Sequence, residues 1–278
     1  MGGRGSKYET IINKHINSQD DLPQNDSTIA IDELKILLDT ETEYHNEMYD
    51  KLKALKVSVR QSTDDLDDKI LERQEKTVYN VVNKYNKIIS YTTELQDLQL
   101  GADTIKSKRG DDVPIAYCLP MLKNGQITQR VVINKNYYKN YDDIVSTINY
   151  GIKNKRFVPI DQKFNTRDYT LTHEFGHAIE NGLYQKTLKA NNIFLEHNLQ
   201  LKTYIENTAI KIKDEVKKIC QQKYNNGKIL TQDEIYLSEY SKKNAREWFA
   251  ETFTNLELAE KPAPIALALG DYLKEKMK

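Results

Sequence analysis

The amino-acid sequence predicts an α+β fold in which helices predominate and one small sheet is present. Apolar residues recur at steps of three and four over most of the chain, which is typical of amphipathic helices. Two short β-type runs, 115–119 and 127–133, are separated by Asn124-Gly125, a dipeptide that favours a hairpin turn. With 278 residues, the chain has room for one large domain or two modest ones.

Composition argues against several classes of protein. Lys+Arg and Asp+Glu are equal at 41 each, so net charge gives no reason to expect a nucleic-acid partner. No apolar run approaches the roughly 18 residues of a membrane-spanning helix, so no membrane partner is expected. The start lacks the apolar stretch of a Sec signal, so we expect a cytoplasmic protein in the producing cell, with a virion or a special export route as alternatives. Two cysteines are too few for a disulfide scaffold.

The N-terminal part of the chain is predicted to contain a leader and a helical arm. Residues 1–28 are rich in Asn, Asp, Ser and Gly and predict a flexible leader. Apolar residues over 29–60 and again over 66–100 fall on one helical face. This pattern predicts a long α-helical hairpin over 29–100. No catalytic group stands out in it, so we interpret it as a surface for oligomerisation or for a particle partner.

Residues 101–278 form the second predicted domain, because composition changes between Gly101 and Asp112. The two β-type runs come first and form the small sheet. Helical patterns then dominate, and the predicted features are a helix over 141–152, helices from about 166 onward, and loops near 225–227 and 261–264.

The segment His173-Glu174-Phe175-Gly176-His177 is the strongest chemical signal in the chain. Two histidines four apart on a helix differ by about 40° in bearing and about 6 Å in height, so both imidazoles can bind one ion. Glu174 lies beside the first imidazole and can take a proton from a metal-bound water. Gly176 costs a helix about 1 kcal/mol relative to Ala, which predicts the close approach of a neighbouring element. The alternative is an ordinary helix with two surface histidines.

One Zn²⁺ ion is the expected cofactor, and it needs a third protein ligand and one open position. A third histidine six residues after His177 is excluded, because Leu183 stands there, and His197 is a weaker candidate. Glu247 and Glu251 share one helical face beside a bulky apolar run, where carboxylates are costly to bury unless paired or metal-bound. We therefore expect Glu247 as the third ligand and Glu251 as the acceptor of a hydrogen bond from a ligand imidazole. Taken alone, this segment is typical of an amphipathic helix.

The two motifs together resemble the gluzincin metallopeptidases, in which HExxH is followed by a distant helix carrying ExxxE. The string from Tyr240 to Phe253 is similar to the catalytic domain of anthrax lethal factor and its relatives, including the Pro-Pro endopeptidases. A weaker resemblance, carried by the MGGRG start and the HEFGHA and NAREWFAE strings, is to metallopeptidase-like domains encoded by phages and mobile elements.

The gluzincin resemblance covers about residues 112–278 and implies a zincin-like fold, with a small twisted sheet above an active-site helix. The roles that it implies are zinc ligation by His173, His177 and Glu247, general-base catalysis by Glu174, and hydrogen-bond donation by Tyr240 to the oxyanion. The interval between the two motifs is longer than in those relatives and predicts extra helices between about 184 and 223.

The function expected from these residues is zinc-dependent endopeptidase activity on a protein or peptide substrate. Such a substrate would add as a strand along a sheet edge, for which Val131–Asn134 is the candidate. The alternatives are a structural or virion-associated protein with a zincin-like fold, whose helical arm mediates assembly, and an exported toxin effector.

Overall fold

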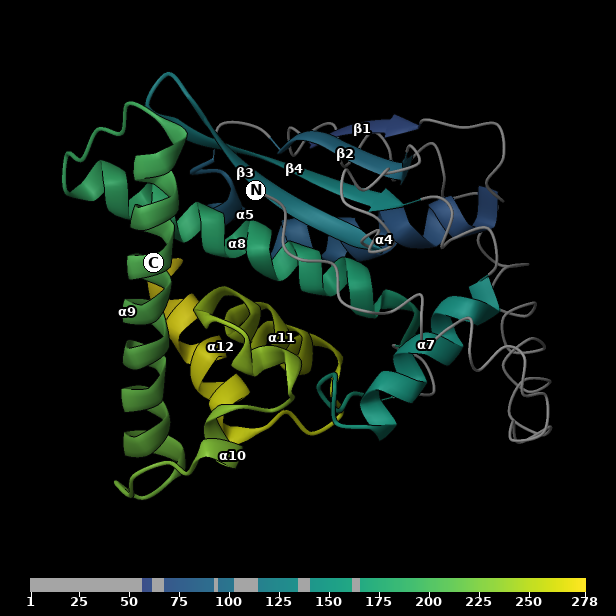
Figure 1. Ribbon diagram of the computed structural model, residues 1–278, viewed down its shortest axis with the longest axis vertical. Coiled ribbons are helices and arrows are strands. Elements are labelled where there is room, and N and C mark those ends of the chain that lie inside the picture. Colours follow the sequence, from purple (N-terminus) through teal and green to yellow (C-terminus); the bar gives the residue numbers. More distant parts are fainter. Residues whose placement is uncertain (1–56, 62–67, 93–94, 103–114, 135–140, 162–165) are drawn as a thin grey trace.

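The computed structural model describes residues 57–61, 68–92, 95–102, 115–134, 141–161 and 166–278. In this part of the chain, helices and one small sheet agree with the predicted α+β class. The elements in chain order are β1 (Val57–Gln61), α4 (Asp68–Lys84), α5 (Asn86–Ile89), β2 (Leu95–Ala102), β3 (Ala116–Lys123), β4 (Gln126–Asn134), α7 (Tyr141–Lys153), η1 (Thr166–Asp168), α8 (Tyr169–Ala190), α9 (Asn198–Tyr224), α10 (Gln232–Ile235), η2 (Tyr240–Lys242), α11 (Ala245–Leu258) and α12 (Pro264–Lys276). The sheet lies across the top of Figure 1, with α8 beneath it and α11 and α12 below α8.

The helical hairpin predicted over 29–100 is wrong where the structure describes that segment. Strands β1 and β2 lie within it, and only α4 and α5 match the second predicted helix. The strand β1 pairs in parallel with β2, and β2 pairs in parallel with β4, so both belong to the sheet of the C-terminal part. Leu95, Leu98 and Leu100 are spaced so that either a helix or a strand is possible, and pairing with β4 determines the outcome.

The remaining predictions for the N-terminal part concern the leader, the first predicted helix and the domain boundary. The leader 1–28 and the first predicted helix up to residue 56 lie outside the described residues. The predicted domain boundary at residue 101 falls inside β2, a strand of the shared sheet.

The four strands have the order β1-β2-β4-β3, and β3 is an antiparallel edge strand. β3 and β4 form the predicted hairpin, and Asn124 and Gly125 at its turn both have positive φ, 52° and 71°. The proposal of Val131–Asn134 as a free edge for a peptide is wrong. That segment lies in β4, where Val131 is opposite Cys118 on one side and Leu98 on the other. Sheet position depends on long-range pairing, which apolar content alone does not reveal.

Helix α8 runs beneath the sheet and is buried along most of its length. Two of its glycines allow close packing. A Cβ on Gly182 would lie 2.5 Å from the carbonyl oxygen of Ile88, and a Cβ on Gly176 would lie 3.0 Å from Cα of Ala250 in α11. Gly176 therefore permits the close approach that the sequence predicted, and its neighbour is the helix that carries the second motif.

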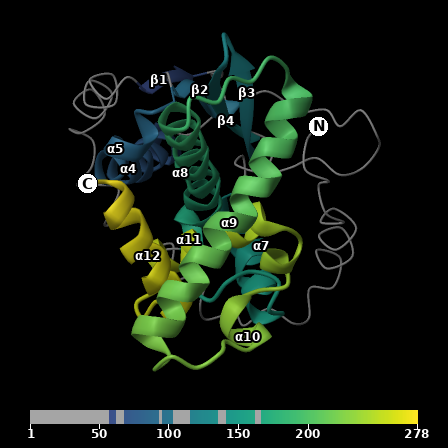
Figure 2. The ribbon, with the colours of Figure 1, turned by 90° about the vertical axis from the view of Figure 1, so that its left-hand side faces the viewer.

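The lower helices hold α11 firmly against α8. Trp248 is fully buried and its Nε1 donates a 2.7 Å hydrogen bond to the carbonyl of Ile235. Figure 2 shows α9 crossing in front of α8 and α11, with α12 beside it. This long helix lies in the interval where extra helices were predicted, and the predicted loops follow α9 and precede α12. None of the described helices is both long and apolar enough to cross a membrane.

Candidate metal centre

His173 and His177 on α8 face Glu247 in the first turn of α11. The Nε2 atoms of His173 and His177 lie 3.2 Å and 3.5 Å from the same Oε2 atom of Glu247. One ligand atom from each of the three residues lies within 4.8 Å of the others, so this group could hold a metal ion. Two imidazole nitrogens and one carboxylate oxygen suit zinc and several other divalent ions. The structure thus brings the three predicted ligands together, whereas His197 caps the N-terminus of α9.

The start of α11 places Glu247 opposite the histidines. Asn244 has an extended backbone, and its Oδ1 accepts hydrogen bonds from the backbone N–H groups of Arg246 and Glu247, both at 2.9 Å. An Asn side chain in this role fixes where a helix begins. Glu247 therefore sits in the first turn, where the positive end of the helix also favours its charge.

Glu247 and the two imidazoles stabilise one another's charges. Burial would raise the pKa of Glu247, but hydrogen bonds and charge from His173 and His177 bring it well below its ordinary range. Burial disfavours the charged form of His173, yet hydrogen bonds with Glu247 and Glu251 raise its pKa to about 10. A metal ion binds the deprotonated imidazole, so metal binding here is coupled to proton release.

Glu251 orients the first imidazole, as the sequence predicted. Its carboxylate is fully buried; Oε1 lies 3.0 Å from Nδ1 of His173 and accepts a 2.6 Å hydrogen bond from the hydroxyl of Tyr169. Oε2 accepts hydrogen bonds from the hydroxyl of Ser238 at 2.7 Å and the backbone N–H of Val158 at 3.0 Å. Because three other groups hold this carboxylate, it fixes the ring of His173 with its Nε2 turned toward Glu247.

Glu174 lies next to the metal-holding group and belongs to the buried part of the site. Glu174 is only 8% exposed, and burial raises the pKa of its carboxyl. The nearby rings of His173 and His177 lower this pKa, as does a hydrogen bond with the backbone of Cys118 in β3. Glu174 is therefore held between the edge strand and the two imidazoles.

Tyr240, in η2, lies beside His173. The centre of its ring is 5.7 Å from that of His173 and 6.1 Å from that of Phe157. Its backbone N–H donates a 3.1 Å hydrogen bond to the carbonyl of Arg156, which ties η2 to the loop after α7. The structure thus places the predicted hydrogen-bond donor beside the first histidine.

Glu180 is a residue of the site that the sequence did not mark as functional. It is fully buried, and its Oε2 lies 3.7 Å from Nδ1 of His177 and 3.4 Å from Nε of Arg246. Within the described part of the chain, His177 Nδ1 and Glu180 Oε1 are buried without a hydrogen-bond partner. Each imidazole therefore has a buried carboxylate beside its Nδ1, Glu251 for His173 and Glu180 for His177. An acidic residue three positions after the second histidine was the available signal.

Replacing Glu180 by Gln should weaken metal binding about tenfold, because residues that orient metal ligands typically contribute ten- to hundredfold in affinity. Titration of the metal-loaded protein with a competing chelator measures the effect. The matched control is Glu257→Gln, which removes a carboxylate that pairs with Lys84 and Tyr85 instead. Equal metal affinity in the Glu180 variant and the control would contradict the orienting role.

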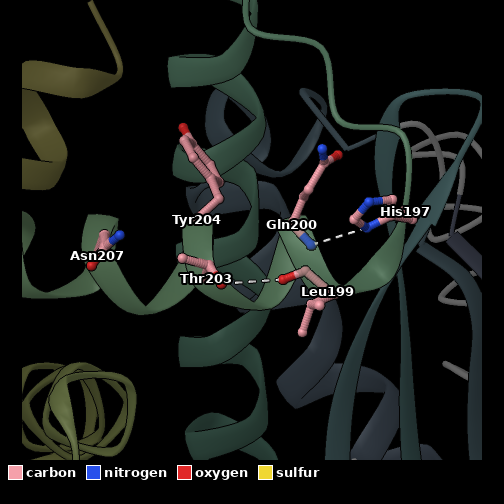
Figure 3. A pocket seen from close by; sticks show the side chains of 6 residues that line it. All are labelled: His197, Leu199, Gln200, Thr203, Tyr204 and Asn207. Atoms are coloured by element: carbon pink, nitrogen blue, oxygen red, sulfur yellow. Dashed lines mark hydrogen bonds between the residues drawn. The ribbon is translucent and has the colours of Figure 1, made fainter.

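A hollow on the surface, drawn in Figure 3, shares no residue with this centre. Its lining consists of His197, Leu199, Gln200, Thr203, Tyr204 and Asn207. Five of them lie in the first part of α9 and His197 is its N-cap; none belongs to the metal-holding group, and none carries an acidic side chain. The hollow therefore offers no comparable chemistry, and the candidate site is the one between α8 and α11.

Comparison of the chain with protein-family models, curated proteins and solved structures finds no match in any of the three. What this site can do must therefore be argued from its own residues.

Proposed function

We propose that this protein is a zinc-dependent endopeptidase of the gluzincin type. The observation that carries the proposal is the convergence of His173, His177 and Glu247, from α8 and α11, on one point. Three such ligands leave a coordination position open for water, as in catalytic zinc sites. A buried carboxylate, Glu174, lies beside them and is not one of the three.

A zincin-like fold is part of this proposal, and the layer arrangement supports it. The helix with both histidines lies beneath a small mixed sheet whose antiparallel strand β3 is at the edge. The helix with the third ligand packs on α8, where Gly176 brings the two backbones close. The competing role, assembly through residues 29–100, has no specific support in the described part, since β1 and β2 belong to the sheet.

The residues of the site fit hydrolysis by an activated water. Zinc, when bound, would lower the pKa of a water ligand and polarise the scissile carbonyl. Glu174 can accept the proton of that water at its carboxylate and return it to the leaving amine. Burial raises the pKa of Glu174, which brings it closer to the range suited to such proton transfer. Tyr240 can donate its hydroxyl to the oxyanion.

We assign the substrate strand to the edge of β3. The N–H of Leu122 donates to Oδ1 of Asn198 at 3.4 Å rather than to β4, so it points away from the sheet. In an antiparallel pair, the backbone polar groups of successive residues point alternately toward and away from the partner strand. Those of Ala116, Cys118 and Pro120 therefore also point away from β4. Pro120 lacks an N–H, which an edge position tolerates. The outward carbonyls of these residues are suited to accept hydrogen bonds from an extended peptide.

Peptide cleavage tests the proposed function directly. Zinc-loaded protein is incubated with a peptide pool, and the products are identified by mass spectrometry with and without a chelator. We expect cleavage that the chelator abolishes and added zinc restores. A protein shown by elemental analysis to hold zinc, yet unable to cleave any peptide in the pool, would contradict the proposal.

Replacing Tyr240 by Phe should lower kcat about 10²- to 10³-fold with little change in KM, because the hydroxyl acts on charge that develops only in the transition state. Steady-state kinetics on a peptide from the pool measures both constants. Tyr204→Phe is the control, since its hydroxyl donates to the carbonyl of Tyr184 on α8. An unchanged kcat for the Tyr240 variant would remove Tyr240 from the mechanism.

A further inference from the structure

Two segments that are distant in the sequence, the loop after α7 and the η2 segment, meet at Tyr240 and carry several basic residues. We call this group the basic flank, and its members are Lys153, Lys155, Arg156, Lys242 and Lys243. The backbone N–H of Glu239 donates to the carbonyl of Lys155 at 2.9 Å, and the N–H of Tyr240 donates to that of Arg156 at 3.1 Å. These bonds hold the loop after α7 and the η2 segment side by side.

The flank is a local excess of positive charge in a chain whose net charge is zero. Positions 150–161 and 236–244 contain the five cations of the flank and two carboxylates, Asp161 and Glu239. Of the five, Lys242 pairs with Glu239. Lys153, Lys155 and Lys243 form no ion pair with a carboxylate of the described residues.

The lysines of α9 include both paired and unpaired ones. Lys202, Lys217 and Lys223 each have a carboxylate partner, respectively Glu206, Asp214 and Asp271. Lys211 and Lys218 on the same helix are exposed and form no ion pair with a carboxylate of the described residues, so the flank is distinguished by its position beside the metal-holding group.

The flank begins next to the metal-holding group. The Nζ of Lys243 lies 3.6 Å from the ring centre of Tyr240, whose ring is 5.7 Å from that of His173. Lys243 is exposed; loss of hydration lowers its pKa, the charge of Glu247 raises it, and the charge of Arg156 lowers it. The ammonium of Lys243 thus interacts electrostatically with Glu247 of the site and with Arg156 of the flank.

The course of β3 shows which part of a peptide would meet the flank. Asn181 of α8 contacts the thiol of Cys118, and Gln185, one turn later, binds the N–H of Ile127, which lies opposite Leu122. β3 therefore runs in the same direction as α8, and its first residues lie toward the start of α8. The flank is at that end. Val158, two residues after Arg156, donates its backbone N–H to the hydroxyl of Tyr169, the first residue of α8.

A peptide that pairs antiparallel with β3, the slightly more stable mode, runs from the α9 end toward the flank. Its residues after the scissile bond then pass the unpaired lysines. We infer that the basic flank binds acidic side chains on the C-terminal side of the scissile bond, so that the substrate class is acidic peptides. This inference rests on the proposed function and names the substrate of that site. Each exposed ion pair should contribute about two- to fivefold in affinity.

The test is peptide binding to the zinc-loaded Glu174→Gln variant, which separates binding from hydrolysis. A fluorescent peptide with an apolar first half and three Glu in its second half is compared, by anisotropy, with a twin carrying three Gln and with the reversed-order peptide. We expect the Glu peptide to bind about tenfold more tightly than both. The difference should vanish in about 1 M salt, where charges are screened beyond about 3 Å.

Variants locate the effect on the flank. Introducing Lys155→Gln and Lys243→Gln together should bring the Glu and Gln peptides to similar affinity, whereas Lys243→Arg, which keeps the charge, should preserve the preference. Lys202→Gln on α9 is the control and should change nothing. Equal binding of the Glu and Gln peptides, tighter binding of the reversed peptide, or a preference that persists after both lysines are neutralised would overturn the inference. Charge-dependent binding by a wild-type protein that cleaves no peptide would support the flank and contradict the endopeptidase.

Discussion

Glu174→Gln is expected to lower kcat for peptide hydrolysis by about 10²- to 10⁴-fold, the range of a general base. Gln keeps the size of the side chain and removes the proton acceptor. The three candidate ligands are His173, His177 and Glu247, so the metal should stay bound. Steady-state kinetics and elemental analysis on the same preparation measure the two effects together.

The control for this variant is Glu257→Gln, which changes an acidic residue of α11 that pairs with Lys84. It should retain full activity and full metal content. Loss of the metal from the Glu174 variant would show that this carboxylate holds the ion rather than the proton, and would contradict the assigned role. Retained hydrolysis would remove Glu174 from the mechanism altogether.

The parts of the site that the sequence predicts are those set by local spacing. His173 and His177 are one helical turn apart, so a helix alone brings their rings to one face. Glu251 and Glu247 are related in the same way on α11. Helical periodicity was enough to place each pair, and the bulky apolar residues beside each pair indicated that both helices are buried.

The parts that the sequence missed depend on partners far along the chain. Strand β2 contains leucines whose spacing fits a helix equally well, and its pairing with β4 makes it a strand. The position of β4 between two neighbours, which removes Val131–Asn134 from the edge, follows from the same long-range pairing. Glu180 was missed because its importance comes from Arg246, a residue 66 positions later, and from an imidazole whose Nδ1 has no other partner in the described part.

Glu247→Gln should weaken zinc binding by more than the ten- to hundredfold typical of residues that only orient ligands. A neutral amide oxygen replaces the anionic donor at the third ligand position, while the two imidazoles on α8 keep their buried carboxylate neighbours Glu251 and Glu180. Competition with a chelator measures the affinity, and Glu257→Gln on the same helix is again the control. Unchanged zinc affinity would mean that the group of His173, His177 and Glu247 is not the binding site.

The metal-free protein gives an independent readout of the same variant. Glu247 helps raise the pKa of His173 from 6.5 to about 10, so protonated His173 stabilises the metal-free fold fully below pH 6.5. That contribution is lost as pH rises from 6.5 through 10, and the Tm of the metal-free protein should fall over this window. Glu247→Gln lowers the pKa of His173, so the fall in Tm should be smaller and should begin from a lower value. An identical pH profile in the two proteins would show that Glu247 and His173 do not interact in solution, and the third ligand would then have to be another residue.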